Sequence, residues 1–426
     1  MARRDLLPET RLYAKKHPHG DCRCPGRAKH NVIRPLMGLF IPSHIKVHSL
    51  TGRITPALVR MAFRAVKRNR GAAGIDKVSI KMFEANLDEN LNSILRDLKD
   101  GSFQPKPLRR QFIDKGNGKL RPLGIPAVRC RVAQEVLRRL LSPIFEPKFH
   151  DASFGFRPGR SCHMAIGQAL REHQCGFKTV LDADIVGFFD NLPHSVILAA
   201  VAAEVADGNI LNLIEKFLRA GVMENGVFKP TTVGTPQGGV ISPLLANIVL
   251  NHLDWVLHQH GFRFVRYADD FVVLTQSKSQ AKEALTLVTQ TLHELGLQLS
   301  PEKTQITSFG KGYTFLGFVL SSRSRRMRPK SLQKFQDKVR LLTKRSYNLD
   351  AALIAKLNRV IRGTAHYFAT HWATTRWQMT RLDGWIRMRL RTLWSKRKRE
   401  TDNYRLPNRK LAQLGLLSLT SFCWQP

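Results

Sequence analysis

The sequence predicts an α+β fold in the middle of the chain, followed by a basic all-α module. Apolar strand patterns alternate there with helical patterns and one hairpin pattern, an order typical of a sheet with helices on one face. Hydrophobic residues make up 43% of the 426-residue chain, which is enough to bury a core. From about Arg323 the composition changes to three basic amphipathic helices. At this length we expect about two or three domains.

The chain is strongly basic. Lysine and arginine total 69 against 32 aspartates and glutamates, a formal net charge of +37. Repulsion on this scale is tolerable when a polyanion neutralises it, so nucleic acid is the expected partner. The alternative is a basic protein that binds acidic membranes or simply stays soluble. The six cysteines are scattered, no secretory signal is present, and no apolar stretch approaches the roughly 18 residues of a membrane span. These features favour a reducing compartment and no membrane.

Residues 1–50 are irregular, basic and rich in Pro and His, so they indicate an N-terminal extension rather than a domain. A metal site is conceivable at His17, His19, Cys22 and Cys24. However, the Cys-x-Cys spacing is tighter than that of a zinc knuckle, and no second cysteine pair follows. A basic arm is therefore the favoured interpretation.

The next stretch predicts helices separated by a hairpin and a loop. Two helices are expected in "PALVRMAFRAVKRNRG" and "KMFEANLDENLNSILRDLKDG". The glycines of "LRRQFIDKGNGKLRPLGIP" permit the turn of a β-hairpin. A helix that ends at the proline is expected in "VRCRVAQEVLRRLLSPIF", then a loop in "SFGFRPGRSC" and a helix in "SCHMAIGQALREH".

The following stretch predicts the buried strands. A strand in "FKTVLDADIVGFF" leads to helices in "HSVILAAVAAEV" and "NILNLIEKFLRAGV". A long helix then begins with Ser242 as its N-cap and Pro243 in its first turn. We expect strand, tight turn and strand in "FRFVRYADDFVVLT", a helix in "SQAKEALTLVTQTLHELG", and a strand pair around "QITSFG" and "YTFLGFVL".

Two groups of carboxylates are expected at the ends of core strands. Asp269 and Asp270 lie at the tip of the predicted hairpin, and Asp182, Asp184 and Asp190 follow the end of another strand. If the two strands are neighbours, Asp184 lies close to Asp269, and the carboxylates repel one another unless divalent cations neutralise them. Hard oxygen ligands suit Mg²⁺, and two such ions about 3.5–4 Å apart are the clamp used for phosphoryl transfer. The alternative is an ordinary surface turn, because turns favour aspartate.

The order of consecutive motifs resembles the reverse transcriptases encoded by bacterial and organellar group II introns, from about residue 50 to residue 420. These motifs are "NRGAAGID", "KLRPLGIP", "SFGFRPGRS", "DADIVGFFDN", "GTPQGGVISPLLANIVLNHLD", "RYADD", "LSPEKTQI" and "FLGF". The resemblance implies a right-hand polymerase fold: fingers and palm with a central antiparallel sheet over 51–322, and an all-α thumb, the maturase domain X, over 323–400. Residues 401–426 are then a short C-terminal tail, a remnant of a DNA-binding region at most.

The resemblance also implies roles for single residues. Asp184, Asp269 and Asp270 match the acidic residues that hold two Mg²⁺ ions, and the backbone carbonyl of Ile185 is expected to face a metal. Phe189 matches the aromatic residue beneath the incoming sugar, where a bulky ring excludes a 2′-hydroxyl; a core role is its alternative, although Phe188 fits the core better.

The remaining matched residues are basic or polar. Lys115 and Arg121 match the cations that neutralise the triphosphate, with solvated surface charge as the alternative, and Gln237 matches a residue against the incoming nucleotide. Arg157 and Arg160 either contact the template or hold the fingers together. The further expected nucleic-acid contacts are Lys303, Arg387 and Arg391.

As a member of that family, the chain is expected to copy intron RNA into cDNA and to assist splicing and retrohoming. The implied partners are group II intron RNA, an RNA template with a DNA primer, target DNA and deoxynucleoside triphosphates. We expect a cytoplasmic ribonucleoprotein in bacteria, with an organellar location as the alternative. No histidine-rich endonuclease motif with two Cys pairs follows, so we expect no cleavage of the second DNA strand. The rival functions are a non-intron reverse transcriptase, in defence or domesticated, and an RNA chaperone without polymerase activity.

Overall fold

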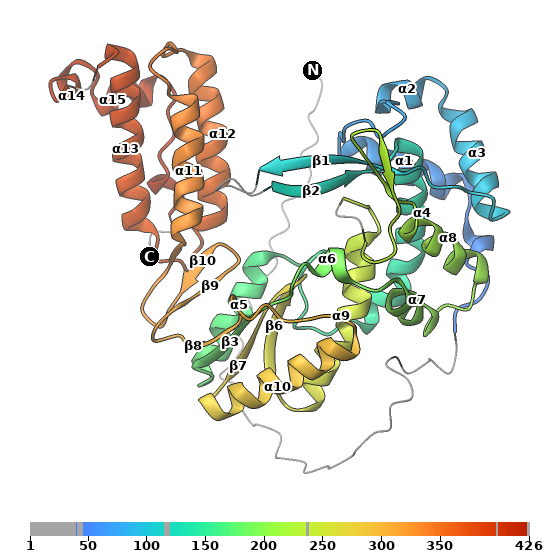
Figure 1. Cartoon of the computed structure of the whole chain (residues 1–426). Helices are drawn as coiled ribbons and strands as arrows, with labels where there is room; N and C mark the ends of the chain where they lie inside the picture. The colour runs from blue at the N-terminus through green and yellow to red at the C-terminus, as the bar shows by residue number, and fades with distance from the viewer. Residues whose placement is uncertain (1–39, 41–45, 115–119, 236–237, 398, 424–426) are drawn as a thin grey trace, which may run out of the picture. The chain divides into compact units, whose positions relative to one another are not determined.

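The computed structural model describes residues 40, 46–114, 120–235, 238–397 and 399–423 (Figure 1). The described residues belong to one unit, Gly38–Pro426, and form three sheets together with helices. The predicted mixed class of helices and antiparallel strands is therefore confirmed. The expected metal ligands His17, His19, Cys22 and Cys24 lie outside the described residues.

The part before the central sheet contains helices and an extended hairpin. Its elements are η1 (Thr51–Arg53), α1 (Pro56–Arg68), α2 (Ile80–Ala85), α3 (Leu87–Lys99), β1 (Leu108–Asp114), β2 (Leu120–Ile125), α4 (Val128–Phe145) and η2 (Glu146–Lys148). The single helix expected before Gly101 is in fact two helices, because Asn86 leaves the helical region at φ −118° and ψ 51°. The helix expected to end at Pro143 instead continues through it to Phe145.

The central sheet has the strand order β6-β7-β3-β8, and every pairing in it is antiparallel. Its strands are β3 (Thr179–Asp184), β6 (Arg263–Tyr267), β7 (Asp270–Thr275) and β8 (Gln305–Ser308). In the register between β3 and β7, Thr179 lies opposite Thr275 and Asp184 lies opposite Asp270. The two predicted core strands are therefore neighbours, and their acidic ends coincide.

Helices cover both faces of this sheet, so the expectation of helices on one face was wrong. Leu181 and Ala183 of β3 pack into one apolar cluster together with α9 (Ser242–Gln259) and α10 (Lys278–Glu294). Val180, the residue before Leu181, packs into a second apolar cluster that includes α5 (Cys162–Gln174). Because side chains alternate along a strand, such a sheet needs apolar residues at nearly every position.

Two local predictions near the sheet need correction. Ser242 is the first residue of α9 rather than its N-cap, and its hydroxyl accepts a hydrogen bond from the Thr235 hydroxyl at 2.6 Å; Pro243 does stand in the first turn. The strand pair expected around "QITSFG" and "YTFLGFVL" does not form. Instead, β8 joins the central sheet, and "YTFLGFVL" folds back on itself within a separate sheet of order β11-β10-β9. Its strands are β9 (Tyr313–Phe315), β10 (Phe318–Leu320) and β11 (Arg325–Met327).

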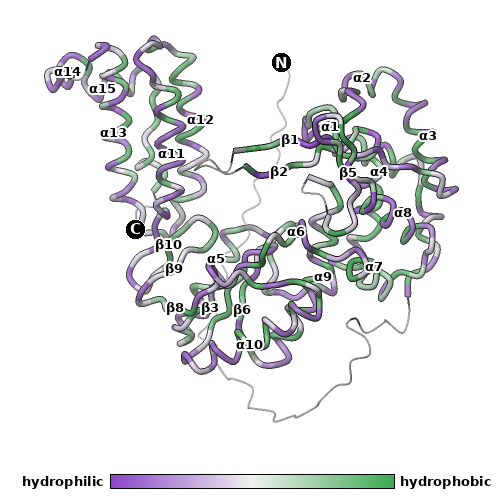
Figure 2. Tube along the Cα trace, in the orientation of Figure 1, coloured by the Kyte–Doolittle hydropathy of each residue, from purple (hydrophilic) through white to green (hydrophobic). Residues whose placement is uncertain are grey.

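The helices that follow are α11 (Pro329–Leu342), α12 (Ala351–Phe368) and α13 (Arg376–Ser395), which run beside one another (Figure 1). Hydrophilic and hydrophobic stretches alternate along all three (Figure 2). In α13, Ile386, Leu390 and Leu393 are buried, whereas Trp394 is 43% exposed. After α13 come α14 (Asp402–Arg405), α15 (Asn408–Gln413) and η3 (Thr420–Phe422). Buried Asp383 of α13 accepts bonds from Ser418, Leu419 and Thr420, which attaches this last segment to the helices.

The remaining elements lie between β3 and α9. They are α6 (Phe188–Asn191), α7 (His194–Ala202), α8 (Gly208–Leu218), β4 (Val222–Glu224) and β5 (Val227–Lys229). Strand β4 pairs parallel to β1 and antiparallel to β5, which completes a third sheet of order β2-β1-β4-β5. Within the described part of the chain, no helix is long and apolar enough to span a bilayer.

Candidate active site

The site is centred on the turn between β6 and β7. Ala268 takes a left-handed conformation (φ +61°), and Asp269 follows it at the tip of the hairpin. Asp270 begins β7 opposite Asp184, the last residue of β3. The tight turn and the approach of the two acidic groups are therefore confirmed.

Four carboxylates, those of Asp182, Asp184, Asp269 and Asp270, lie at this end of the two central strands and interact electrostatically. Burial, together with the charge of Asp184, raises the pKa of Asp269. Desolvation by the surrounding protein, followed by the charges of Asp182, Asp269 and Asp184, raises the pKa of Asp270 to about 7. Burial also raises the pKa of Asp182. Solvent still reaches Asp270, so the mutual repulsion is the part of these shifts that a bound cation relieves.

Lys303 supplies a positive charge at the same end of β3. Its Nζ lies 2.6 Å from Oδ2 of Asp184, although the two residues are 119 positions apart. Lys303 follows Ser300, whose backbone N–H bonds to the carbonyl of Asp184 at 2.7 Å, so the loop before β8 is fixed against the end of β3. The sequence predicted a nucleic-acid contact for Lys303, and in this structure it contacts a carboxylate.

The donor set fits a hard divalent cation, although protein side chains alone do not complete a coordination shell. Among the residues that the structure describes, no three His, Cys, Asp or Glu side chains are gathered as a ready ligand set. Mg²⁺ is commonly held by one or two carboxylates, with water and substrate phosphates as its other ligands. Solvent-accessible carboxylates whose charges repel one another meet that requirement.

Ile185 and Phe189 lie directly beyond Asp184. Ile185 is 4% exposed and forms an isolated bridge with Leu299. The backbone turns at Gly187 (φ +48°), and α6 begins with Phe188. Phe188 is 2% exposed, whereas Phe189 is only half-buried and stacks edge-on against it.

The glycine-rich loop before α9 is bonded to this segment. The N–H of Thr235 donates to the carbonyl of Phe189 at 2.7 Å. On its other side, Gly238 lies against β2: a Cβ added there would come within 2.3 Å of the carbonyl oxygen of Gly124. The loop therefore spans from the Phe189 segment to the β1–β2 hairpin. Gln237 itself lies outside the described residues.

Two cations, Lys115 and Arg121, were expected from the β1–β2 hairpin, and the structure describes Arg121. Arg121, in β2, is close enough to Asp269 to lower its pKa, which opposes the effect of burial. Arg121 pairs across the hairpin with Ile113. Lys115 falls in the loop outside the described residues.

Arg157 and Arg160 belong to the loop that packs against the Asp269 turn through Gly155. The Arg157 side chain is 4% exposed and bonds to the carboxylate of Glu146 and to the carbonyls of His150 and Ser153. This placement favours the role of holding the loop together over contact with nucleic acid. Arg160 pairs with the exposed carboxylate of Asp151 at 2.7 Å and remains partly accessible.

Arg387 and Arg391 lie on α13. Arg391 donates to the carbonyl of Leu406 at 2.9 Å and to Oδ1 of Asn408 at 2.7 Å, so it ties the C-terminal segment to the helix. Arg387 is half-buried and close enough to influence Arg391 electrostatically. The structure thus gives Arg391 a structural contact that the sequence did not suggest.

Sequence reasoning missed a buried polar network beneath the turn. Arg266 is 0% exposed, and so is its partner Asp254 in α9; Asn247 is 2% exposed. A signal was available, because Arg266 interrupts an otherwise apolar strand pattern, and a buried arginine requires a partner.

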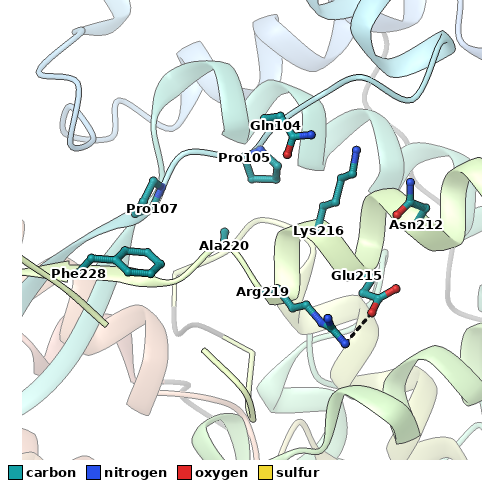
Figure 3. A pocket seen from close by; sticks show the side chains of 9 residues that line it. All are labelled: Gln104, Pro105, Pro107, Asn212, Glu215, Lys216, Arg219, Ala220 and Phe228. Atoms are coloured by element: carbon teal, nitrogen blue, oxygen red, sulfur yellow. Dashed lines mark ion pairs between the residues drawn. The ribbon is translucent and has the colours of Figure 1, made fainter. Parts of the chain in front are cut away.

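A pocket of about 520 Å³ lies elsewhere in the chain (Figure 3). Its lining comes from the segment before β1, from the end of α8 and from β5: Gln104, Pro105, Pro107, Asn212, Glu215, Lys216, Arg219, Ala220 and Phe228. None of these residues belongs to the carboxylate cluster, and Glu215 and Arg219 already pair with each other at 2.9 Å. The pocket is therefore separate from the candidate active site.

Comparison with known families identifies the class of this fold and site. A family model described as reverse transcriptase (RNA-dependent DNA polymerase) matches residues 113–320, which include all the acidic residues above. The chain thus has a polymerase domain of a class that generally uses divalent metal ions. A second model, the group II intron maturase-specific domain, matches residues 332–411. The chain belongs to the family of group II intron-encoded reverse transcriptases and maturases.

Curated relatives agree with this assignment. The chain is 34% identical to protein YkfC of Escherichia coli over 324 residues, 66% of this chain and 85% of YkfC. It is 32% identical to the group II intron-encoded protein LtrA of Lactococcus lactis subsp. cremoris over 379 residues, 72% of this chain and 61% of LtrA. It is 33% identical over 291 residues to an uncharacterized 91 kDa protein in a cob intron of Schizosaccharomyces pombe, covering 54% of this chain and 36% of that protein.

Proposed function

We propose that this protein is an RNA-directed DNA polymerase that copies group II intron RNA into cDNA, and a maturase that binds the intron RNA to assist splicing and retrohoming. The observation that supports this most directly is the register of β3 with β7, which sets Asp184 opposite Asp270 beside the Asp269 turn. A maturase-specific match over residues 332–411 favours the intron role over a defence enzyme or an RNA chaperone.

In this proposal the chain is divided as in a right-hand polymerase. Residues 51–322 are fingers and palm, residues 323–400 are the thumb, or maturase domain X, and residues 401–426 are a short tail that is at most a remnant of a DNA-binding region. Residues 1–50 are a basic extension. The basic faces of α11–α13 suit a nucleic-acid duplex or folded RNA, both of which are held mainly through phosphates.

Asp184, Asp269 and the carbonyl of Ile185 would hold two Mg²⁺ ions, with Asp270 as a supporting acid. When bound, these ions would activate the primer 3′-hydroxyl and stabilise the leaving pyrophosphate. Arg121 would attract and orient the triphosphate. Lys115 and Gln237 lie outside the described residues, and for them we propose only the roles that the family implies: neutralising the triphosphate and contacting the incoming nucleotide. Phe189 presents its ring beneath the sugar and excludes a 2′-hydroxyl. We assign contacts with nucleic acid to Lys303, which bonds to Asp184, to the partly accessible Arg160, and to Arg387 on α13.

The substrates follow from this chemistry: an RNA template, a DNA primer or target DNA, and deoxynucleoside triphosphates. We further propose that the protein works as a cytoplasmic ribonucleoprotein in bacteria or as its organellar counterpart. The intron RNA is the partner that would offset much of the net charge of +37.

Primer extension on an RNA template tests the proposal. We expect deoxynucleotide incorporation with Mg²⁺ and none with EDTA. Asp269→Asn should lower extension by at least about 10³-fold, since a carboxylate ligand to the ions is lost, while binding of the RNA stays within about twofold. A parent protein that binds RNA but never extends a primer would contradict the polymerase function. A splicing assay with the intron that surrounds the gene tests the maturase function separately.

A further inference from the structure

We propose that Arg266, Asp254 and Asn247 form a positioning network that sets the orientation of the Asp269 turn for catalysis. This inference rests on the proposed polymerase function and adds to it three residues that do not touch the substrate. All three are at most 2% exposed, so the network is sealed from solvent.

At the centre of the network, Arg266 and Asp254 form an ion pair with two parallel hydrogen bonds. Nε of Arg266 donates to Oδ1 of Asp254 at 2.7 Å, and Nη2 donates to Oδ2 of the same carboxylate. A guanidinium and a carboxylate joined at two points have one favoured mutual orientation. Asp254 lies in α9, so the helix fixes the position of the arginine within the strand.

The remaining donors of the guanidinium reach the turn itself. Nη1 of Arg266 donates to the carbonyl of Ala268 at 3.0 Å and to Oδ1 of Asn247 at 2.9 Å. The Ala268 carbonyl belongs to the peptide bond that joins Ala268 to Asp269. Because Ala268 is a non-glycine residue with a positive φ, its conformation carries an energetic cost and needs such support.

The same network clamps the loop on the other side of the turn. Nδ2 of Asn247 donates to the carbonyl of Gly155 at 2.8 Å. A Cβ added at Gly155 would come within 2.3 Å of the Ala268 nitrogen, so the loop backbone packs directly against the turn. Two backbone bonds continue the contact, from Phe154 N–H to the Arg266 carbonyl at 2.8 Å and from Arg266 N–H to the Ala152 carbonyl at 2.9 Å.

A positioning role differs from simple stabilisation in what it predicts. A buried ion pair contributes little net stability compared with apolar residues of similar volume, because desolvating the two charges is costly. An apolar side chain at position 266, by contrast, cannot donate the hydrogen bond that the Ala268 carbonyl accepts from Arg266. Replacing the pair by apolar residues should therefore spare the fold while loosening the turn.

The test uses the full chain with Arg266→Met and Asp254→Leu combined, measured beside the parent. We expect a melting temperature close to that of the parent, a fall in kcat of about 10- to 100-fold, and a similar rise in the Mg²⁺ concentration for half-maximal rate, as for residues that orient metal ligands. The KM for the primer–template should be unchanged. The control pair Arg129→Met with Asp97→Leu removes a partly buried ion pair between α4 and α3 and should alter neither kcat nor the Mg²⁺ requirement.

A second variant and a second readout keep the proposal testable. Arg266→Lys preserves the charge but cannot form the two parallel hydrogen bonds that a guanidinium makes with a carboxylate. It should therefore show the same shift in Mg²⁺ requirement, even if the double variant folds poorly. Fe²⁺ with ascorbate and peroxide serves as the probe for direct metal binding, with backbone cleavage beside Asp184 and Asp269 mapped by mass spectrometry. The variants should lose cleavage at Asp269. Parental kcat, Mg²⁺ dependence and cleavage in both variants would overturn the proposal. A parent that is cleaved at both positions but extends no primer contradicts the polymerase function alone.

Discussion

Phe188 and Phe189 are neighbours of the same type that differ in burial. The left-handed Gly187 turns the chain after β3, and the short helix α6 directs Phe188 into the core while Phe189 stays half-buried. The N–H of Thr235 bonds to the Phe189 carbonyl, which holds this residue beside the glycine-rich loop. The ring that is partly open to solvent is the one available to a substrate.

Phe189→Ala tests this assignment. Removing the ring leaves space for a 2′-hydroxyl, so incorporation of ribonucleotides relative to deoxynucleotides should rise by about 10-fold or more, the scale of discrimination that steric exclusion in a pocket provides. Single-nucleotide extension with each triphosphate measures the ratio. Phe188→Leu is the control, because it changes a core side chain and should lower stability while leaving the ratio near its parental value. An unchanged ratio in Phe189→Ala would remove the gate role.

At the scale of single elements, the glycine-rich loop is held against β2 by a residue without a side chain. Gly238 has φ +117°, and a Cβ there would approach the Gly124 carbonyl oxygen to 2.3 Å. Both the backbone conformation and the lack of space therefore require glycine. The loop reaches Thr235 and Phe189 at its other end, so displacing it disturbs the floor of the site.

We therefore expect Gly238→Ala to lower kcat/KM for deoxynucleotides by at least about 10-fold, since displacements near 1 Å cost up to about 100-fold. Gly226→Ala separates strain from crowding. Gly226 also has a positive φ, of +83°, but nothing lies within 4 Å of an added Cβ, so this variant should lose about 1 kcal/mol of stability without loss of activity. Equal activity losses in both variants would show that crowding at β2 is not the cause.

The elements were predictable where the signal is local. The hairpin around Asp269 and the strand before Asp184 follow from short apolar runs and turn residues. The helix break at Asn86 and the continuation of α4 through Pro143 were missed, because tertiary packing decides them. The partner of β8 was missed for a related reason: strand pairing at long sequence separation leaves no local pattern.

The candidate site was predictable in its acids and less so in its support. Asp184, Asp269 and Asp270 stand out because carboxylates at the ends of core strands are unusual. The contact of Lys303 with Asp184 and the burial of Arg157 depend on three-dimensional neighbours. Arg266 was readable in principle as a charge within an apolar strand, but its partner in α9 was not.

At the scale of the whole molecule, the net charge of +37 should control binding of RNA. Each phosphate neutralised by Lys or Arg releases condensed counterions, so the logarithm of affinity falls linearly with the logarithm of salt. Six to ten such contacts would weaken binding by about 10³- to 10⁵-fold between 50 and 200 mM salt. Filter binding or fluorescence anisotropy across a salt series measures the slope. A flat response would remove the electrostatic account of binding.

The pH dependence of stability should show an acid limb. Burial lowers the pKa of His150, His194 and His252 below the ordinary value of 6.5. As pH falls below about 6.5, the unfolded chain takes up protons at these positions before the folded protein does, so the free energy of unfolding falls. Thermal melts at constant ionic strength between pH 7 and pH 5 test this. His150→Gln should reduce the slope, because it removes one of these titrating groups.

Strand β3 lies between β7 and β8, which are synthesised much later in the chain. Thr179 of β3 is paired with Thr275 on one side and with Ser308 on the other. During synthesis, Asp184 emerges long before the residues that flank it, and local contacts cannot bring it to its final surroundings. A ribosome-bound chain that has not yet reached β7 and β8 lacks the acidic centre altogether. Only chains that already contain both β7 and β8 can therefore carry out nucleotide chemistry.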